Sequence, residues 1–509
     1  MAHGRPRQGT ALAAAVAAAS LTAFAATLDN TVVAVALREM QRDLGSGVTG
    51  LQGIVTAYTV ALAALLLAGG ALVDALGAKR VLLAGLLVFG TASAACAIAP
   101  GISTLIVARG VQGAGAALML PGGLALLAAT VPDPVRRRRC IAAWASVAGL
   151  ALVAGPVVGG ELVAIAGWPW VFWINLPICA VAFLLALAVP RAPVKPRARL
   201  DLAGMALTCL VLGLATGAVV LAGHGSRGLM ALCLSGAVAS ATALVVVERR
   251  RPDPLLPASL MRDRGLRAAA IGSLATALAL FLALVFLALF LQLVQDRDAR
   301  DAGRLLLTLP AALVVAAALT SRWHATVVPV VVGLVGTGIA LLLMGGRLSA
   351  GTTTRELALQ LGLMGAGIGL TTAPLVATAL AAASGREGLA AATVSMAREL
   401  GGVIAVGGLG SVAVARLAGR LSSALAAGGV SPGARPALLD AALGARTADV
   451  RRMLLQDLGI AQALVVGPRL SAVATSSFVA STSLVLQLAG GLVLLAAAAC
   501  GWLLRPRAA

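Results

Sequence analysis

The chain has 509 residues, of which 60% are apolar and 11% are charged. This composition excludes a soluble protein, because about a quarter of the residues in a soluble domain are charged. The formal net charge is +20, but no soluble domain accompanies the basic clusters, so we expect no nucleic-acid partner. Apolar runs of about 20 residues recur from end to end, and such runs cross a bilayer as helices. We therefore predict an all-α polytopic membrane protein.

A hydropathy window of about 19 residues predicts fourteen membrane spans. Residues 5–26 also fit a signal peptide, but the run continues past Asp29 and no soluble domain follows it, so we interpret it as the first span. The predicted spans lie near residues 11–36, 50–73, 81–99, 102–131, 140–165, 169–189, 202–222, 229–247, 268–292, 304–321, 325–345, 356–381, 388–415 and 475–503.

Basic residues orient these spans, because one set of loops contains most of them and the short loops of the other set contain few. The basic positions include Arg5, Arg7, Lys79, Arg80, Arg136 to Arg139, Arg191, Lys195, Arg197, Arg199, Arg249 to Arg251, Arg262, Arg264, Arg267, Arg322, Arg386, Arg505 and Arg507. Cytoplasmic loops are enriched in such residues, so we expect both termini in the cytoplasm and contact with anionic lipids.

Opposite charges lie in the first and fourth spans. Asp29 and Arg109 are both expected about two helical turns below the outer surface, where a direct or water-bridged contact is possible. Burying a charge in a membrane costs at least about 2.5 kcal/mol, so such groups are usually functional. We interpret Asp29 as a proton-coupling carboxylate and Arg109 as the group that adjusts its proton affinity, with a fixed structural ion pair as the alternative.

The fifth span concentrates glycine and proline between residues 151 and 160. Gly155 and Gly159 are four residues apart, share one helix face and allow another helix backbone to approach closely. Pro156 removes a helical hydrogen bond and is expected to bend the axis. Together with Gly160, these residues predict a packing seam that moves.

Two further carboxylates lie within predicted spans. Glu399 follows Arg398 in the thirteenth span, where it either takes part in coupling or forms a local ion pair. Glu161 lies near the outer end of the fifth span, and we interpret it as interfacial, with a functional role as the alternative.

Residues 417–472 form the longest segment between predicted spans and are expected on the outer side. Breakers at Gly428 and Gly429 precede Arg451 and Arg452, which begin a stretch that fits a short amphipathic surface helix. We expect a packed surface loop, with a lid as the alternative.

Nothing in the sequence indicates a cofactor or an enzymatic site. The six cysteines and three histidines show no spacing typical of metal or redox sites. We find no phosphate-binding loop and no nucleophile motif. We therefore expect no metal, no cofactor and no enzymatic activity, and transport that uses an ion gradient or runs downhill.

Four motifs resemble those of the major facilitator superfamily, in particular its fourteen-helix drug:proton antiporter branch. Residues 70–80 are similar to the cytoplasmic loop motif, with matching positions at Gly70, Asp74, Gly77, Lys79 and Arg80. Residues 28–33 resemble the first-span motif, and residues 108–115, with Arg109 and Gln112, resemble the fourth-span motif. Residues 151–160 resemble the fifth-span antiporter motif.

This resemblance implies two six-helix bundles, residues 1–190 and 268–509, joined by residues 191–267 with two inserted spans. The second bundle would include the outer segment 417–472. Asp74 would hold the bundles closed on the cytoplasmic side through charge and helix-dipole contacts, and residues 155–160 would form the outer seam between them. Alternating access would then rock one half against the other.

The sequence departs from the family pattern in four places. Ala75 replaces a basic residue of the loop motif, and Ala151 replaces the first glycine of the antiporter motif. The second-half copy of the loop motif, expected near residues 319–324, lacks its glycine and aspartate. Glu399 stands where similar proteins often carry a glutamine, and this added carboxylate would change coupling or favour a cationic substrate.

The resemblance implies a proton-coupled antiporter that exports small amphipathic or cationic drugs or antibiotics. Abundant alanine and arginine, with only two lysines, suggest a GC-rich bacterial genome and hence a bacterial cytoplasmic membrane. We expect a monomer whose partners are substrate, protons and lipids. The alternative is a proton-coupled or facilitative transporter of an endogenous metabolite, which the antiporter motif disfavours.

Overall fold

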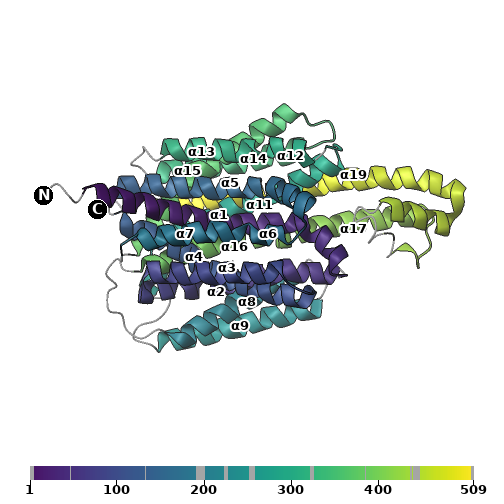
Figure 1. Cartoon of the computed structure of the whole chain (residues 1–509). Helices are drawn as coiled ribbons and strands as arrows, with labels where there is room; N and C mark the ends of the chain where they lie inside the picture. Colours follow the sequence, from purple (N-terminus) through teal and green to yellow (C-terminus); the bar gives the residue numbers. More distant parts are fainter. Residues whose placement is uncertain are drawn as a thin grey trace.

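The computed structural model describes residues 5–45, 48–131, 133–190, 201–222, 227–250, 258–297, 299–320, 326–383, 386–435, 438 and 447–505. These residues form helices and no strand (Figure 1). The helices are α1 (Arg5–Asp43), α2 (Val48–Leu76), α3 (Ala78–Ala97), α4 (Ile102–Thr130), α5 (Pro134–Ala166), α6 (Trp170–Trp173), α7 (Asn175–Ala188), α8 (Leu202–Ala222), α9 (Arg227–Arg249), α10 (Ala258–Arg262), α11 (Arg264–Leu293), α12 (Ala299–Leu306), α13 (Thr308–Thr320), α14 (Val327–Arg347), α15 (Thr354–Ala382), α16 (Glu387–Val403), the π-helix η1 (Ile404–Leu409), α17 (Gly410–Ala427) and α19 (Thr447–Leu504).

The apolar runs become membrane-spanning helices, as predicted. Within the described part of the chain, twelve helical segments are long and apolar enough to cross a membrane. The two halves of α5, bent by 47°, make a thirteenth, and α8 contributes a shorter apolar stretch, Leu202–Ala218. The protein is thus an all-α multi-pass membrane protein, although the predicted number of fourteen is not reproduced exactly, because the described part of α8 is too short.

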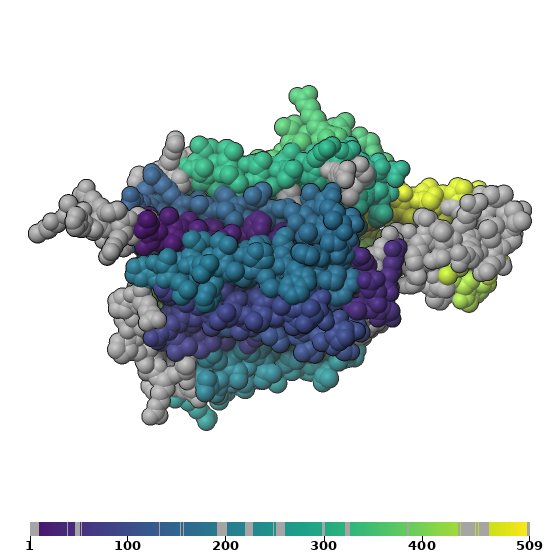
Figure 2. All heavy atoms as spheres, viewed as in Figure 1, coloured from purple at the N-terminus to yellow at the C-terminus, as the bar shows by residue number. Residues whose placement is uncertain are grey.

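The helices run side by side along one axis (Figure 1). The start of α1 and the end of α19 lie at the same end of the bundle, which we call the terminal end; the other end is the far end. The inserted helices α8 and α9 pack on the outside of the bundle, with α8 against α2. In the space-filling view, the side chains of α1, α3 and α7 form one continuous face (Figure 2).

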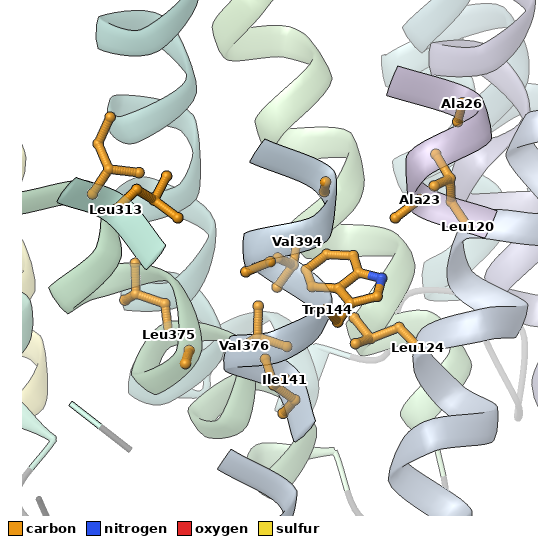
Figure 3. Packing of buried hydrophobic residues seen from close by; sticks show 14 of the residues in the cluster. Ala23, Ala26, Leu120, Leu124, Ile141, Trp144, Leu313, Leu375, Val376 and Val394 are labelled. Atoms are coloured by element: carbon orange, nitrogen blue, oxygen red, sulfur yellow. The ribbon is translucent and has the colours of Figure 1, made fainter. Parts of the chain in front are cut away.

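The buried core joins the two halves of the chain through α5. Trp144 and Ile141 of α5 lie between side chains of both halves (Figure 3). The neighbours labelled there are Ala23 and Ala26 of α1, Leu120 and Leu124 of α4, Leu313 of α13, Leu375 and Val376 of α15, and Val394 of α16. Helix α5 is therefore one of the elements of the first half that meet the second half, together with α2 and α4, which pack on α16.

The glycines of α5 pack as closely as predicted, but against a different partner. A Cβ on Gly155 would collide with the Thr31 side chain of α1, and one on Gly159 would lie 3.2 Å from the Cα of Val32. Both contacts lie within the first half, so these two glycines pack α5 against α1, whereas Val157 between them lies beside Gly303 of the second half. A face of small residues predicts a close helix neighbour but does not specify which one.

The helix bends where the sequence predicts a bend. The axis of α5 changes direction by 47° between Leu152 and Val157, the stretch that contains Pro156. Contact with the second half is made on either side of this bend. A Cβ on Gly149 would lie 3.6 Å from Leu313, and Val157 lies 3.7 Å from the Cβ position of Gly303.

The outer segment 417–472 is mostly helical, which corrects the prediction of a loop. α17 ends at Ala427, Gly429 follows with φ 78°, and α19 then runs without interruption for 58 residues. The amphipathic stretch near Arg451 thus lies in the first part of α19, before the membrane-length segment Pro468–Leu504. α17 and α19 extend beyond the other helices at the far end (Figure 1). The apolar cluster that joins them consists of Leu421, Leu425, Val430, Leu438, Leu454 and Leu470.

A pair of hydrogen bonds fixes the turn that precedes α19. The backbone amide and the hydroxyl of Ser431 donate to the Asp457 carboxylate at 2.9 and 2.5 Å. These bonds hold the pKa of Asp457 below its usual value, because they stabilise the charged form. The outer segment is therefore a packed helical projection.

The α1–α5 contact predicts different outcomes for two alanine substitutions on the same helix. Gly155→Ala should lower the melting temperature in detergent, because the new methyl group overpacks the contact at a cost of about 1–3 kcal/mol. Gly160→Ala is the matched control, since no atom lies within 4 Å of its Cβ position. Equal melting temperatures for the two variants would contradict the assigned packing.

Candidate functional site

A buried ion pair joins α1 and α4. Arg109 Nη1 donates to Asp29 Oδ2 at 2.5 Å, and both side chains are almost fully buried, with exposures of 1% and 0%. The predicted direct contact is therefore present. Arg109 Nε also donates to the carbonyl of Ile54 in α2 at 3.3 Å, and its guanidinium lies 4.3 Å from the ring centroid of Tyr58. The guanidinium is thus held by a carboxylate, a carbonyl and an aromatic face.

Two side-chain amides complete the surroundings of Asp29. Gln112 Nε2 and Asn175 Nδ2 donate to Asp29 Oδ1 at 2.9 and 2.8 Å. Both amides also donate to Ser93 Oγ, at 3.1 and 3.0 Å, and the Ser93 hydroxyl donates to the carbonyl of Phe172 at 2.9 Å. Gln112 Oε1 accepts from Arg109 Nη1 at 2.7 Å. Three donors therefore stabilise the Asp29 carboxylate in a water-poor environment.

We call Asp29, Arg109, Gln112, Asn175, Ser93 and Tyr58 the charge cluster. Three of these residues were not expected from the sequence. Ser93, Asn175 and Tyr58 come from α3, α7 and α2, and all three side chains are buried. A signal existed for two of them, since Tyr58 is the only tyrosine of the chain and Asn175 is one of two asparagines. Polar side chains that are rare in the chain and lie inside an apolar span deserve the same scrutiny as charges.

A central cavity lies beside this cluster, between the two halves of the chain. Tyr58 belongs to both, because its ring packs under Arg109 and also lines the cavity. The polar lining residues are Thr27, Asn30 and Tyr58 of the first half and Ser273, Thr276, Thr372, Arg398 and Glu399 of the second half. The cavity volume is about 90 Å³. A pocket for a drug-sized ligand has roughly 300–1,000 Å³, so this cavity is smaller than such a ligand needs.

Arg398 and Glu399 are neighbours in sequence but have different contacts. The Arg398 guanidinium lies 5.3 Å from the ring centroid of Trp144 in α5, so it contacts the first half across the cavity wall. Glu399 forms no hydrogen bond or salt bridge with any other described residue. Arg398 and Glu399 interact electrostatically, but no salt bridge within 4.0 Å joins these two described residues. Glu161 is exposed near the far end of α5, away from the cavity.

A second carboxylate joins the two halves at the terminal end. Asp74 accepts hydrogen bonds from the backbone amides of Gly388 and Leu389, at 2.6 and 3.0 Å, in the first turn of α16. Gly70 permits this approach, since a Cβ there would lie 2.6 Å from the Gly388 carbonyl. The expected contact between Asp74 and a helix dipole of the other half is therefore present.

The rest of the loop motif shapes the connection between α2 and α3. Gly77 has φ 93°, a conformation that favours glycine, and it lets α3 begin directly after α2. Lys79 Nζ donates to the carbonyls of Leu187 and Val189 at 2.7 and 2.5 Å, so a positive charge covers the C-terminus of α7. Arg80 is exposed. The second-half copy, near residues 319–324, lies largely outside the described residues.

In the part of the chain that the structure describes, no group of three or more His, Cys, Asp or Glu residues is arranged to hold a metal ion. The candidate site therefore consists of the charge cluster, the cavity and the contact of Asp74.

Comparison with known proteins gives consistent results. Residues 19–406 match the family model of the Major Facilitator Superfamily. The multidrug resistance protein Stp of Mycobacterium tuberculosis is 32% identical over 412 residues, which cover 79% of this chain and 76% of that protein. The puromycin resistance protein pur8 of Streptomyces alboniger is 34% identical over 423 residues, or 80% and 82% of the two chains. The methylenomycin A resistance protein of Bacillus subtilis is 34% identical over 391 residues, or 75% and 83%.

Solved structures share the fold at low sequence identity. The human organic anion transporter MFSD10 has a TM-score of 0.57 and 16% identity, over 96% of this chain and 99% of that chain. The proton:xylose symporter XylE has a TM-score of 0.54 and 12% identity, over 78% and 88% of the two chains. These likenesses establish the arrangement of helices.

The contact of Asp74 predicts that its loss opens the terminal end. Asp74→Ala removes two hydrogen bonds to a charged acceptor, each worth about 1.5–3 kcal/mol. We expect a longer distance between spin labels at Leu76 and Met261, exposed residues of α2 and α10. Asp133→Ala is the matched control, because Asp133 accepts from the backbone amide of Arg136 within one half. An unchanged distance in Asp74→Ala, or an equal change in Asp133→Ala, would contradict a closing role.

Proposed function

The chain belongs to the Major Facilitator Superfamily, and we propose that it is a proton-coupled antiporter that exports small amphipathic drugs or antibiotics. The relatives at 32–34% identity are named as multidrug, puromycin and methylenomycin A resistance proteins, which supports a drug or antibiotic as the substrate. The observation that carries the proton-coupled part is the buried Asp29–Arg109 pair beside the central cavity.

Asp29 is the proton-coupling group in this proposal, because the cluster can hold Arg109 in either protonation state of Asp29. If Asp29 takes up a proton, Arg109 keeps the Gln112 and Ile54 oxygens as acceptors and the Tyr58 ring as a cation–π partner. An unpaired buried guanidinium would otherwise make protonation very costly. The Asp29–Arg109 ion pair can therefore break and re-form in this proposal.

Tyr58 and Asn30 connect this proton site to the substrate cavity. Asn30 follows Asp29 on α1 and lines the cavity, and the Tyr58 ring separates the cavity from Arg109. A substrate in the cavity displaces these two side chains and thereby shifts the Asp29–Arg109 pair. Competition between substrate and proton through shared side chains is the basis of antiport in this proposal.

Alternating access follows from contacts between the halves. Asp74 holds α2 to the first turn of α16 at the terminal end, and the cavity lies between the two halves. We assign the terminal end to the cytoplasm, because the basic Lys79 and Arg136 to Arg139 lie in the first turns of α3 and α5 on that side. Both termini are then cytoplasmic, and the membrane is the bacterial cytoplasmic membrane.

The lining of the cavity supports an amphipathic substrate, preferably a cation. Small and apolar side chains such as Ala148, Leu152 and Phe281 form most of its wall. Glu399 supplies a carboxylate without a salt-bridge partner among the described residues, and Arg398 is engaged with Trp144. A cationic centre near Glu399 would satisfy that charge.

Inverted membrane vesicles with an acidic lumen test this proposal. Wild type should accumulate tetraphenylphosphonium and puromycin in the lumen. The rate of this pH-driven uptake should be at least about ten-fold lower in Asp29→Asn, because asparagine does not exchange a proton. Glu399→Gln should transport an uncharged dye such as Nile red like wild type but lose uptake of tetraphenylphosphonium.

Retention of full pH-driven uptake by Asp29→Asn would remove Asp29 from the coupling mechanism. Uptake by wild type only when the lumen is more alkaline would reverse the direction and favour import. Equal losses for cationic and uncharged compounds in Glu399→Gln would show that this carboxylate does not select cations.

A further inference from the structure

Hydrogen-bond counting in the charge cluster leaves one buried atom without a partner. Ser93 Oγ accepts two hydrogen bonds and donates one, both amide hydrogens of Gln112 are used, and Gln112 Oε1 accepts from Arg109. Both hydrogens of Asn175 Nδ2 are also used, toward Asp29 Oδ1 and Ser93 Oγ. Asn175 Oδ1 is buried and has no hydrogen-bond partner. A buried orphan acceptor in an otherwise saturated network requires an explanation.

The network as it stands fits only the ionised form of Asp29. Every neighbour that contacts its carboxylate is a donor, and a carboxylate is an acceptor on both oxygens. Protonation turns one of these oxygens into an O–H donor that needs an acceptor. Ser93 Oγ and Gln112 Oε1 are already occupied, so the free acceptor next to Asp29 is Asn175 Oδ1.

A turn of the Asn175 amide by half a revolution brings this acceptor to Asp29. The turned amide accepts from the protonated Asp29 Oδ1 and gives up its own hydrogen bond to Ser93 Oγ, which keeps the one from Gln112. No other hydrogen bond of Asp29 has to move, since Arg109 binds the opposite oxygen, Oδ2. The only covalent change is the proton itself, which water delivers to Asp29 and later removes.

We propose that the side-chain amide of Asn175 is a proton-linked switch, which donates to ionised Asp29 through Nδ2 and accepts from protonated Asp29 through Oδ1. This inference rests on the proposed proton coupling at Asp29. It makes Asn175 a positioning residue that transmits the protonation state from α1 to α7 and, through Ser93, to α3.

The other titratable groups around Asp29 differ from Asn175 in their contacts. Arg109 of α4 pairs with its Oδ2, and Tyr58 of α2, Cys96 of α3 and Cys179 of α7 interact with it electrostatically. Glu399 of α16 acts on Tyr58, and α5 presents glycines to this part of α1. Within the described residues, none of these groups offers a free neutral acceptor to Asp29.

Asparagine-specific isotope labelling tests the switch in the intact protein, because the chain has only two asparagines, Asn30 and Asn175. Protein labelled with ¹⁵N in the asparagine side chain is placed in lipid bilayers, and the amide signals are followed by solid-state NMR as the pH changes. The variant Asn30→Thr assigns the two signals. We expect the Asn175 signal to shift with the same pH midpoint as transport, and to stop titrating in Asp29→Ser.

The pH midpoint of transport is a second measurement, and it would stay unchanged if Asn175 had a purely structural role. Asn175→Leu should shift the pH midpoint of uptake upward by about one unit, because the lost bond to the carboxylate is stronger than a bond to the neutral acid. Cys179→Ala is the matched control, since Cys179 lies one helical turn further along α7 and is also buried. Its midpoint should equal that of wild type.

The outcomes separate this inference from the proposed function. A pH-dependent transporter whose Asn175 signal does not titrate would overturn the switch and leave the coupling role of Asp29 intact. Transport that is independent of pH, in wild type and in Asp29→Asn alike, would overturn both. An equal shift of the midpoint in Asn175→Leu and Cys179→Ala would reduce Asn175 to a packing residue.

Discussion

A carboxylate and a guanidinium inside a membrane protein must satisfy each other, since lipid and apolar side chains offer neither charge a partner. Asp29 and Arg109 meet this constraint with a direct hydrogen bond, and they also bond α2 through Ile54 and α7 through Asn175, while Ser93 of α3 joins through Gln112 and Asn175. Five helices of the first half are therefore positioned around one ion pair. In the proposed mechanism, a proton on Asp29 therefore acts at a point where all five helices meet.

The same half is tied to the second half in places that can separate. Helix α5 contacts α13 through Gly149, Arg398 lies over Trp144, and Asp74 caps the first turn of α16. The glycines of α5, in contrast, lock α5 to α1 beside Asp29. The helix that contains Asp29 is therefore packed directly on α5, which contacts α13 and α15 of the second half.

How much of this the sequence predicts depends on the kind of residue. The depth of Asp29 and Arg109 within their spans was readable, because span ends fix depth, and of the two possible contacts the direct one is present. Gly155 and Gly159 predicted close packing but not its partner, since small residues are compatible with many neighbours. Asn175 and Ser93 carry no charge and did not stand out. The start of α19 was expected to be a separate, short amphipathic surface helix, because amphipathic periodicity does not tell whether a helix continues into a span.

The central claim is that substrate and proton compete through Asp29. Proton release on substrate binding tests it most directly, with purified protein in detergent, a weakly buffered solution and a pH-sensitive dye. Addition of tetraphenylphosphonium to wild type at a pH where Asp29 is protonated should acidify the solution, and Asp29→Asn should bind the cation without acidification. Equal acidification by both proteins would contradict the account, because the released proton would then come from another group.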